Sequence, residues 1–327
     1  MSLQKRLSRT GLLFVLPFCV IYAAFQLFPI IYSLCLSFYS WDGITEKTFV
    51  GFANYIKIFT KDPYFFKSIG NVLIIMAGYL PLALILGFLI AVLMYNKIFY
   101  KYTRLKRFFQ TVQFLPYIIV PVACGLLYML LFDWGTGVVN QMFLKMGLID
   151  DKINWLGNPE TGRLVLMIMQ VWRLSGYVMT IYLAGLANVS TELIEAAQID
   201  GANARQVMLR IMLPLLKNVT MFLVLTSVID GIQLFDAPKV LFTTGQVGAA
   251  VGGPQRSCLT PVWYMYDTSF GSSGSSDLGL GAAISYGIFL FIVVASIFCN
   301  RLLTGKNKNP ENDNGAGGHR HGRGRNL

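Results

Sequence analysis

The chain alternates between long uncharged runs and short charged segments. Uncharged stretches cover Thr10–Trp41, Ser68–Asn96 and Phe108–Phe132. A helix needs about 20 mainly apolar residues to cross the hydrocarbon layer of a bilayer, so each run is long enough to span it. Three later apolar stretches carry few charges or none: Leu164–Thr191, Ile211–Phe235 and Leu278–Asn300. The pattern predicts an all-α integral membrane protein with six transmembrane helices.

The first apolar run is longer than one straight span requires. Pro17 and Pro29 are candidates for a kink, because proline has no backbone N–H to donate inside a helix. A secretory signal peptide is the alternative, since basic residues precede the run within residues 1–10. The run is too long for that and lacks a clear small-residue cleavage site. We therefore expect residues 1–10 to form a short tail before the first span.

Composition and charge agree with a membrane protein. The chain is 55% hydrophobic and 13% charged, too apolar for a water-soluble protein of 327 residues. Its net charge of +11 would fit nucleic-acid binding, but no soluble stretch is long enough to form a binding domain. The loop Lys97–Arg107 has five basic residues and no acid, which predicts a cytoplasmic position. Six spans then place both termini in the cytoplasm.

A polar segment, residues 191–214, separates the fourth span from the fifth. Glu192–Ile199 is rich in helix-forming residues, Gly201 favours a break, and Asn203 is suited to cap a second helix. Pro214 then prevents a straight continuation into the membrane. By composition alone, this is a loop that merely joins two spans. The order of residues indicates more.

The segment contains three sequence blocks at fixed spacing. They are Glu195-Ala196-Ala197, Ile199-Asp200-Gly201, and Ile211 followed by Leu213-Pro214. Together these blocks closely resemble the cytoplasmic coupling loop of permeases in ATP-binding-cassette (ABC) importers, in particular the maltose-type permeases for sugars and oligosaccharides. Met208 and Met212 depart from the family pattern, which usually has an aromatic residue and often has threonine there. The resemblance implies the type I ABC importer permease fold, with Glu195, Ala196, Ala197, Asp200, Gly201 and Pro214 coupling to an ATPase subunit.

Two outer-loop motifs extend the resemblance over nearly the whole region of the spans. Gly51-Phe52-Ala53-Asn54-Tyr55 follows the first span, and Asn154-Trp155-Leu156-Gly157 precedes the fourth. After the fifth span the likeness weakens, because Thr244-Gly245 is separated from Gly252-Gly253-Pro254 by an apparent insertion within 245–254. The resemblance implies a permease domain over residues 11–304.

The resemblance also implies partners and a location. It implies a heterodimer with a second permease subunit, two ATPase subunits that hold ATP and Mg, and an extracytoplasmic solute-binding protein, all at the bacterial cytoplasmic (inner) membrane. No nucleic acid is implied. The basic tail, residues 305–327, has no apolar periodicity and is expected to be disordered. His319 and His321 in that tail are a weak metal pattern, and we expect no metal site or bound cofactor in this chain.

The sequence lacks the residues that an energy-coupling or catalytic centre would need. No G-x-x-x-x-G-K-[ST] motif is present, so a partner must hydrolyse ATP. Both histidines lie in the tail, which disfavours an intramembrane enzyme with a Ser/His/Asp set. A secondary transporter would normally show more spans and ionisable residues placed for ion coupling. These two classes remain the alternatives to an importer permease.

Polar residues inside the spans are the candidates for the substrate path. A lone charge such as Arg173 in mid-span costs about 2.5–3.5 kcal/mol on insertion scales, so it must face protein or water. Asp230 is either its ion-pair partner or a second path residue. Ser227 and Gly231 are four residues apart and share one helix face, with Gln233 nearby. The resemblance implies that this part of the fifth span lines the sugar site.

Two aromatic residues near Arg173 complete the candidate set. Trp172 and Tyr177 offer faces that stack on sugar rings, although most aromatic side chains in membrane proteins face lipid or pack. The charge of Arg173 suits an acidic saccharide, whereas neutralisation by Asp230 would leave recognition of a neutral one through hydroxyl groups. Both possibilities stay open at this stage.

Overall fold

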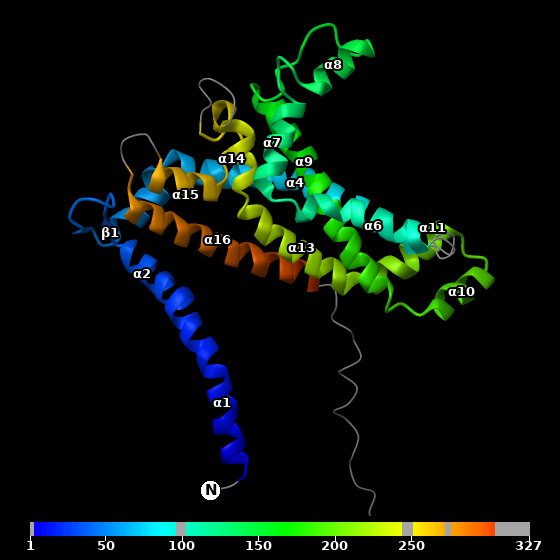
Figure 1. The fold of residues 1–327 in the computed structure, drawn as a ribbon, viewed down its shortest axis with the longest axis horizontal. Helices are drawn as coiled ribbons and strands as arrows, with labels where there is room; N and C mark the ends of the chain where they lie inside the picture. The colour runs from blue at the N-terminus through cyan, green and yellow to red at the C-terminus, as the bar shows by residue number, and fades with distance from the viewer. Residues whose placement is uncertain (1–2, 96–102, 244–250, 272–275, 305–327) are drawn as a thin grey trace, which may run out of the picture.

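Two long helices form the centre of the structure, α4 (Pro63–Tyr95) and α9 (Pro159–Leu186). They cross closely at Gly87, where an added Cβ would lie 2.5 Å from Val178 Cγ1 and 2.9 Å from the carbonyl oxygen of Ser175. A larger residue there would force the helices apart. The computed structural model describes residues 3–95, 103–243, 251–271 and 276–304 (Figure 1).

The first span diverges from the rest of the bundle (Figure 1). It consists of α1 (Leu3–Tyr22), a π-helical turn (Ala23–Leu27) and α2 (Phe28–Leu36). The π-helical turn ends two residues before Pro29, as expected where proline removes a helical hydrogen bond, whereas Pro17 lies inside α1. Helix α2 contacts α16 (Leu278–Thr304) through Tyr286, whose hydroxyl donates to the carbonyl of Ile30 at 2.6 Å.

A small structured loop joins the first two spans. It contains a two-stranded antiparallel ribbon followed by short helical turns: β1 (Tyr39–Ser40), β2 (Thr48–Phe49), α3 (Ala53–Ile56) and a π-helical turn (Lys57–Lys61). The buried Asn54 side chain donates to the carbonyls of Ser37 and Tyr39, each at 2.9 Å. Asn54 of the Gly51–Tyr55 motif therefore fastens the end of the first span to this loop.

The third apolar run is bent sharply, although the sequence pattern predicts a single span. Helix α6 (Thr103–Ile118) meets α7 (Pro121–Leu131) at 95°. Val120 has an extended backbone, with φ −53° and ψ 132°, because a residue before proline disfavours the helical conformation. The bend leaves the backbone at residues 119–120 outside regular helix.

The fourth span leads into a chain of short helices before the fifth. These are α10 (Thr191–Ile199), α11 (Ala204–Gln206), a π-helical stretch (Val207–Met212), α12 (Leu213–Leu215) and α13 (Lys217–Ile232). The chain bends by 68° between residues 215 and 217, just after Pro214. The predicted interruption at Pro214 is confirmed.

The remaining short helices are α8 (Val138–Lys145), α14 (Asp236–Thr243), a 3-10 turn (Pro254–Arg256) and α15 (Pro261–Phe270). Arg163 ties the loop of this turn to the bundle, since its Nε donates to the carbonyl of Ser257 at 2.9 Å and its Nη2 donates to Asn71 Oδ1 at 3.0 Å. Trp155 of the second outer-loop motif donates to Asn140 of α8 at 2.8 Å.

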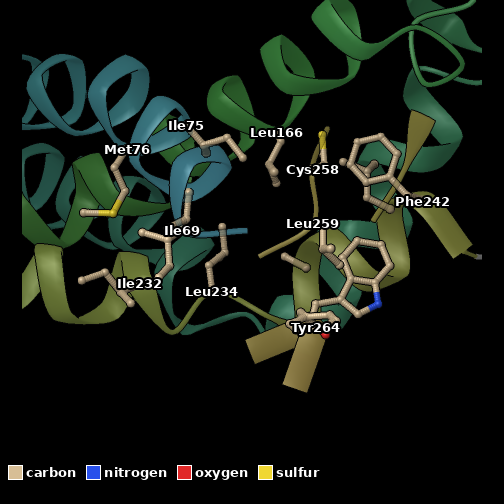
Figure 2. Close-up of a cluster of buried hydrophobic side chains, with 14 of the residues drawn as sticks. Ile69, Ile75, Met76, Leu166, Ile232, Leu234, Phe242, Cys258, Leu259 and Tyr264 are labelled. Atoms are coloured by element: carbon tan, nitrogen blue, oxygen red, sulfur yellow. The ribbon is translucent and has the colours of Figure 1, made fainter. Parts of the chain in front are cut away.

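A buried apolar cluster joins the spans to the segments that connect them (Figure 2). Ile75 and Met76 of α4 pack there with Leu166 of α9 and Ile232 of α13, while Phe242 joins them from α14. Cys258 and Leu259 of the loop after the 3-10 turn are fully buried in the same cluster. The loop that follows the 3-10 turn therefore belongs to the core of the fold.

Four helices in the described part of the chain are long and apolar enough to cross a membrane, and six segments qualify if each bent pair is one span. The all-α membrane class is thereby confirmed. Which side each end faces stays a prediction. Residues 244–250, within the apparent insertion, and the tail with His319 and His321 lie outside the described residues.

Candidate functional site

Residues 191–214, the coupling segment, form the helix, break and helix that the sequence predicts. Gly201 lies at the break with φ +84°, a left-handed conformation that glycine adopts without steric cost. A Cβ added at Gly201 would meet nothing within 4 Å. Glycine is therefore required at this position for its backbone conformation, since a side chain would meet no neighbouring atoms.

A capping box begins the second helix. Asn203 Oδ1 accepts from the backbone N–H of Gln206 at 2.9 Å, and Gln206 Oε1 accepts from the N–H of Asn203 at 2.8 Å. These reciprocal bonds satisfy two amides that would otherwise lack partners at a helix start. The predicted cap at Asn203 is confirmed, and it fixes where the chain leaves the break.

Helix α10 has two different faces. Ile194 and Ala197 pack against the apolar cluster that also contains Val207 and Met212. Ile199, at the C-terminal end of the helix and on its other side, is 85% exposed, and Leu193, which shares a face with Ala197, is 49% exposed. Glu195, Ala196 and Asp200 are exposed as well. The segment is thus anchored to the bundle on one side and presents an apolar tip with acidic neighbours on the other.

The anchored side connects the coupling segment to the fifth span. Val207 and Met212 are 3% and 7% exposed, and they share a cluster with Tyr182 and Leu186 of α9. Tyr182 in turn donates to Thr220 Oγ1 of α13 at 3.1 Å. Packed side chains therefore connect α10, through the π-helical stretch, to α9 and α13.

A cavity of about 510 Å³ lies between four parts of the chain. Tyr79 lines it from α4, and Gln170, Arg173 and Leu174 line it from α9. The other lining residues come from the bend between α6 and α7 and from the end of α13 with the start of α14: Tyr117, Ile118, Ile119, Val120, Pro121, Ser227, Asp230, Gln233, Leu234, Phe235, Asp236 and Ala237. Four of the seven predicted path residues line this cavity, namely Arg173, Ser227, Asp230 and Gln233.

Arg173 is held in the cavity wall by a neutral neighbour. Its Nη1 donates to Gln170 Oε1 at 3.2 Å, and its Nε is buried without a hydrogen-bond partner among the described residues. In the part of the chain that the structure describes, no carboxylate lies within 4 Å of the guanidinium, Asp230 included. The structure therefore shows no ion pair between Arg173 and Asp230.

Ser227 and Gly231 share a helix face but have different surroundings. Ser227 lines the cavity, is 2% exposed, and its Oγ has no hydrogen-bond partner among the described residues. Gly231 faces α4, where an added Cβ would lie 2.7 Å from Tyr79 Oη and 2.8 Å from Met76 Sδ. Gly231 thus allows close helix packing, and it is not among the residues that line the cavity.

The two aromatic candidates lie beside the cavity and do not line it. Trp172 packs with the main apolar cluster, its ring centroid 5.8 Å from that of Tyr128. Tyr177 stacks on Tyr117, with centroids 4.6 Å apart and an interplanar angle of 19°. Tyr117 lines the cavity, so Tyr177 supports the wall from behind.

Four polar lining residues were not predicted: Tyr79, Tyr117, Gln170 and Asp236. One signal was available for Gln170, which precedes Arg173 by three residues and therefore shares its helix face. Tyr79 and Tyr117 resemble ordinary aromatic residues of a span, and only the packing of α4 and α6 brings them to the cavity.

The chain matches the family described as "Binding-protein-dependent transport system inner membrane component" over residues 83–305. It is 34% identical over 295 residues to the lactose transport system permease protein LacF of Rhizobium radiobacter, covering 90% of this chain and 94% of the relative. It is 31% identical to the arabinooligosaccharides transport system permease protein AraP of Bacillus subtilis (strain 168), covering 89% of this chain and 87% of the relative.

The fold is similar to that of a chain in a bacterial ABC transporter involved in the import of the acidic polysaccharide alginate. The TM-score is 0.72, and the likeness covers 94% of this chain and 99% of that chain. The sequence identity is 22%, so the likeness concerns the fold.

Proposed function

The chain belongs to the family of binding-protein-dependent transport system inner membrane components, and we propose that it is one transmembrane subunit of an ATP-driven importer for sugars or oligosaccharides. Relatives at 34% and 31% identity are named as permeases for lactose and arabinooligosaccharides, which supports a saccharide substrate. In this proposal the chain has no catalytic residue of its own. Two partner ATPase subunits bind ATP and Mg and perform the hydrolysis.

The exposed tip of α10 is the observation that carries the coupling part of the proposal. Ile199 is 85% exposed although Ile194 and Ala197 of the same helix are packed against the bundle. Burying an isoleucine side chain contributes about 1.5–3 kcal/mol, so this tip is suited to a cleft on an ATPase subunit. Glu195 and Asp200 add negative charge beside it. Closure of the cleft would then displace α10 and, through Val207 and Met212, α13.

A second permease subunit completes the translocation path in this proposal. Ile118 and Val120 at the bend in the third span are 65% and 64% exposed beside the cavity. The 24-residue first span also makes little contact with its own bundle. A partner subunit would cover these surfaces and close the open side of the cavity, while a solute-binding protein delivers the saccharide to the outer face.

The charge of the substrate is the finer part of the proposal. Arg173 lines the cavity without an ion pair, which favours acidic saccharides among those carried. Asp230 and Asp236 line the same cavity and favour hydroxyl recognition, as a neutral saccharide would require.

Reconstitution of the complex tests the proposed function. The chain is co-purified with its partner permease and ATPase subunits, and ATP hydrolysis is measured in proteoliposomes with loaded or empty solute-binding protein. We expect hydrolysis to rise with loaded protein and uptake to require every component. Robust saccharide transport by this chain alone would contradict the proposal.

A further inference from the structure

The bend in the third span places a helix start at the cavity. Val120 is the N-cap of α7 and Pro121 is its first residue, and both line the cavity. In the first turn of α7 the amides of Ala123 and Cys124 both bond to the carbonyl of Val120, whereas the amide of Val122 makes no backbone bond among the described residues. A helix start carries about half a positive charge and is a ready site for anions.

Arg173 lies beside this helix start. Arg173 lines the same cavity as Val120 and Pro121 of this helix start. Two positive features, a guanidinium and a helix start, therefore face the same cavity. Asp230 and Asp236 line the same cavity, but neither carboxylate lies within 4 Å of the guanidinium, so the local positive potential at Arg173 and the helix start favours a group rich in oxygen between them.

Ser227 independently indicates a ligand at the same cavity. It is 2% exposed, and its hydroxyl has no partner among the described residues, although buried polar groups normally have one. The buried Nε of Arg173 is likewise unsatisfied. Both groups donate hydrogen bonds and both atoms are covered by protein, so a ligand with several acceptor oxygens would reach them after a small movement of the two side chains.

Gln170 keeps Arg173 available for such a ligand. The side chain is 7% exposed, and its Oε1 accepts one guanidinium hydrogen bond while leaving the charge intact. Tyr79 and Tyr117 line the cavity together with Arg173 and Asp230, and the two opposite charges form no ion pair with each other. Because the Gln170 amide is neutral, Arg173 can donate to acceptor oxygens of a ligand, while Asp230 can accept from ligand hydroxyls.

We propose that Arg173, held by Gln170, forms with the α7 helix start and Ser227 a subsite for one anionic group of the carried saccharide, while Asp230 and Asp236 accept bonds from its hydroxyls. The anionic group is a carboxylate, as in a uronate, or a phosphate, because a guanidinium binds both in the same way. Gln170 is a positioning residue. This inference rests on the proposed function and specifies how its substrate is oriented.

Binding to the purified, detergent-solubilised complex, without the solute-binding protein, tests the subsite. The probes are digalacturonate and its neutral counterpart galactobiose, with galactose 6-phosphate as the phosphate. We expect the complex to bind digalacturonate at least about tenfold more tightly than galactobiose, as a bond to a charged group contributes about 1.5–3 kcal/mol. Tighter binding of galactose 6-phosphate than of both disaccharides would support the same subsite with phosphate as the group.

Variants separate recognition from folding. Gln170→Glu keeps the side-chain volume but offers Arg173 an ion pair, so we expect it to abolish the preference for the anionic probe. Arg173→Gln should abolish it as well, and Ser227→Ala should weaken anionic binding severalfold. Galactobiose binding should change less than about twofold in Gln170→Glu, a selectivity that a merely structural role would not give.

Lys239→Gln is the matched control. The Lys239 ammonium lies 3.7 Å from the centroid of the Tyr266 ring, and Lys239 does not line the cavity. The substitution therefore removes a positive charge near the cavity without altering the subsite. We expect the preference to persist in this variant.

The outcomes also separate this inference from the proposed function. Equal affinity for all three probes, or a preference for an anionic probe that survives in Arg173→Gln, would overturn the subsite. If galactobiose is bound and stimulates ATP hydrolysis in that case, the importer proposal stands without it. Failure to bind any of the three probes, together with no stimulation of ATP hydrolysis, would remove both.

Discussion

The coupling segment and the cavity are built in opposite ways. The coupling segment is contiguous: its break at Gly201, its cap at Asn203 and its exposed tip at Ile199 lie within a few residues of one another. The cavity is assembled from four separate parts of the chain. In the first region each residue acts through local backbone geometry, whereas in the second it acts through the packing of distant helices. Substitutions in the two regions should therefore fail in different ways.

The largest effect is expected for Gly201→Val. A β-branched residue at φ +84° is strained by about 1–3 kcal/mol, which reduces the population of a docking-competent conformation about ten- to hundredfold. Uptake should fall accordingly while ATP hydrolysis continues, as measured in parallel in proteoliposomes. Gly147→Val is the control, since Gly147 has φ +67° and equally open space but lies in an outer loop. Equal loss of uptake in both variants would indicate a folding defect.

Ile199→Ser should weaken assembly and leave the isolated subunit intact. Ile199 is 85% exposed, so the folded chain loses little, but docking loses roughly 1.5 kcal/mol or more of apolar burial, about tenfold in affinity. Surface plasmon resonance with the ATPase subunits measures this change. Leu148→Ser, at a position 66% exposed in the outer loop, should bind them as the unmodified chain does. Unaltered affinity of Ile199→Ser would exclude the tip as the contact.

Gly231→Ala tests whether a residue beside the cavity acts through helix packing. An added methyl group would collide with Tyr79 Oη and Met76 Sδ, and overpacking of this kind costs about 1–3 kcal/mol. Thermal unfolding in nanodiscs should show a lower midpoint, with ATPase binding unchanged. If the midpoint is unaltered and only saccharide binding is lost, Gly231 contacts the substrate, as the sequence predicted.

Asn203→Ala should have the smallest effect. Loss of the capping box costs about 1 kcal/mol, confined to the start of α11. Hydrogen exchange should accelerate at residues 204–207, with uptake only mildly reduced. Unchanged exchange there would show that tertiary packing, and not the cap, holds the segment.

The same contrast explains what the sequence could predict. The coupling segment was predictable because glycine, asparagine and proline determine its local geometry within about 25 residues. The bend at Val120–Pro121 was not, since Pro17, Pro81 and Pro116 lie inside helices and proline alone does not decide between a kink and a break. Tertiary packing decides it.

In the cavity, the sequence predicted the charged lining residues but not the uncharged residues that line the cavity beside them. Arg173 and Asp230 were recognisable because charges inside spans are rare. Trp172 was included for its position next to Arg173, yet adjacent residues on a helix point about 100° apart, and it packs into the core. Gln170, three residues away, shares the face and lines the cavity. Tyr79 required knowledge of how α4 packs against α13.

Thiol labelling across the two regions tests their coupling most directly. Gln233→Cys is introduced into an otherwise cysteine-free chain, because Gln233 is an exposed lining residue of the cavity. Its labelling by a membrane-impermeant reagent is measured in the assembled complex, with the ATPase subunits open or trapped closed with ATP. We expect a severalfold change in rate on closure, and we expect Gly201→Val to abolish that change. Two results would contradict the account. One is an equal change in labelling rate when Gly201→Val is present, and the other is no change in labelling rate when Gly201 is retained.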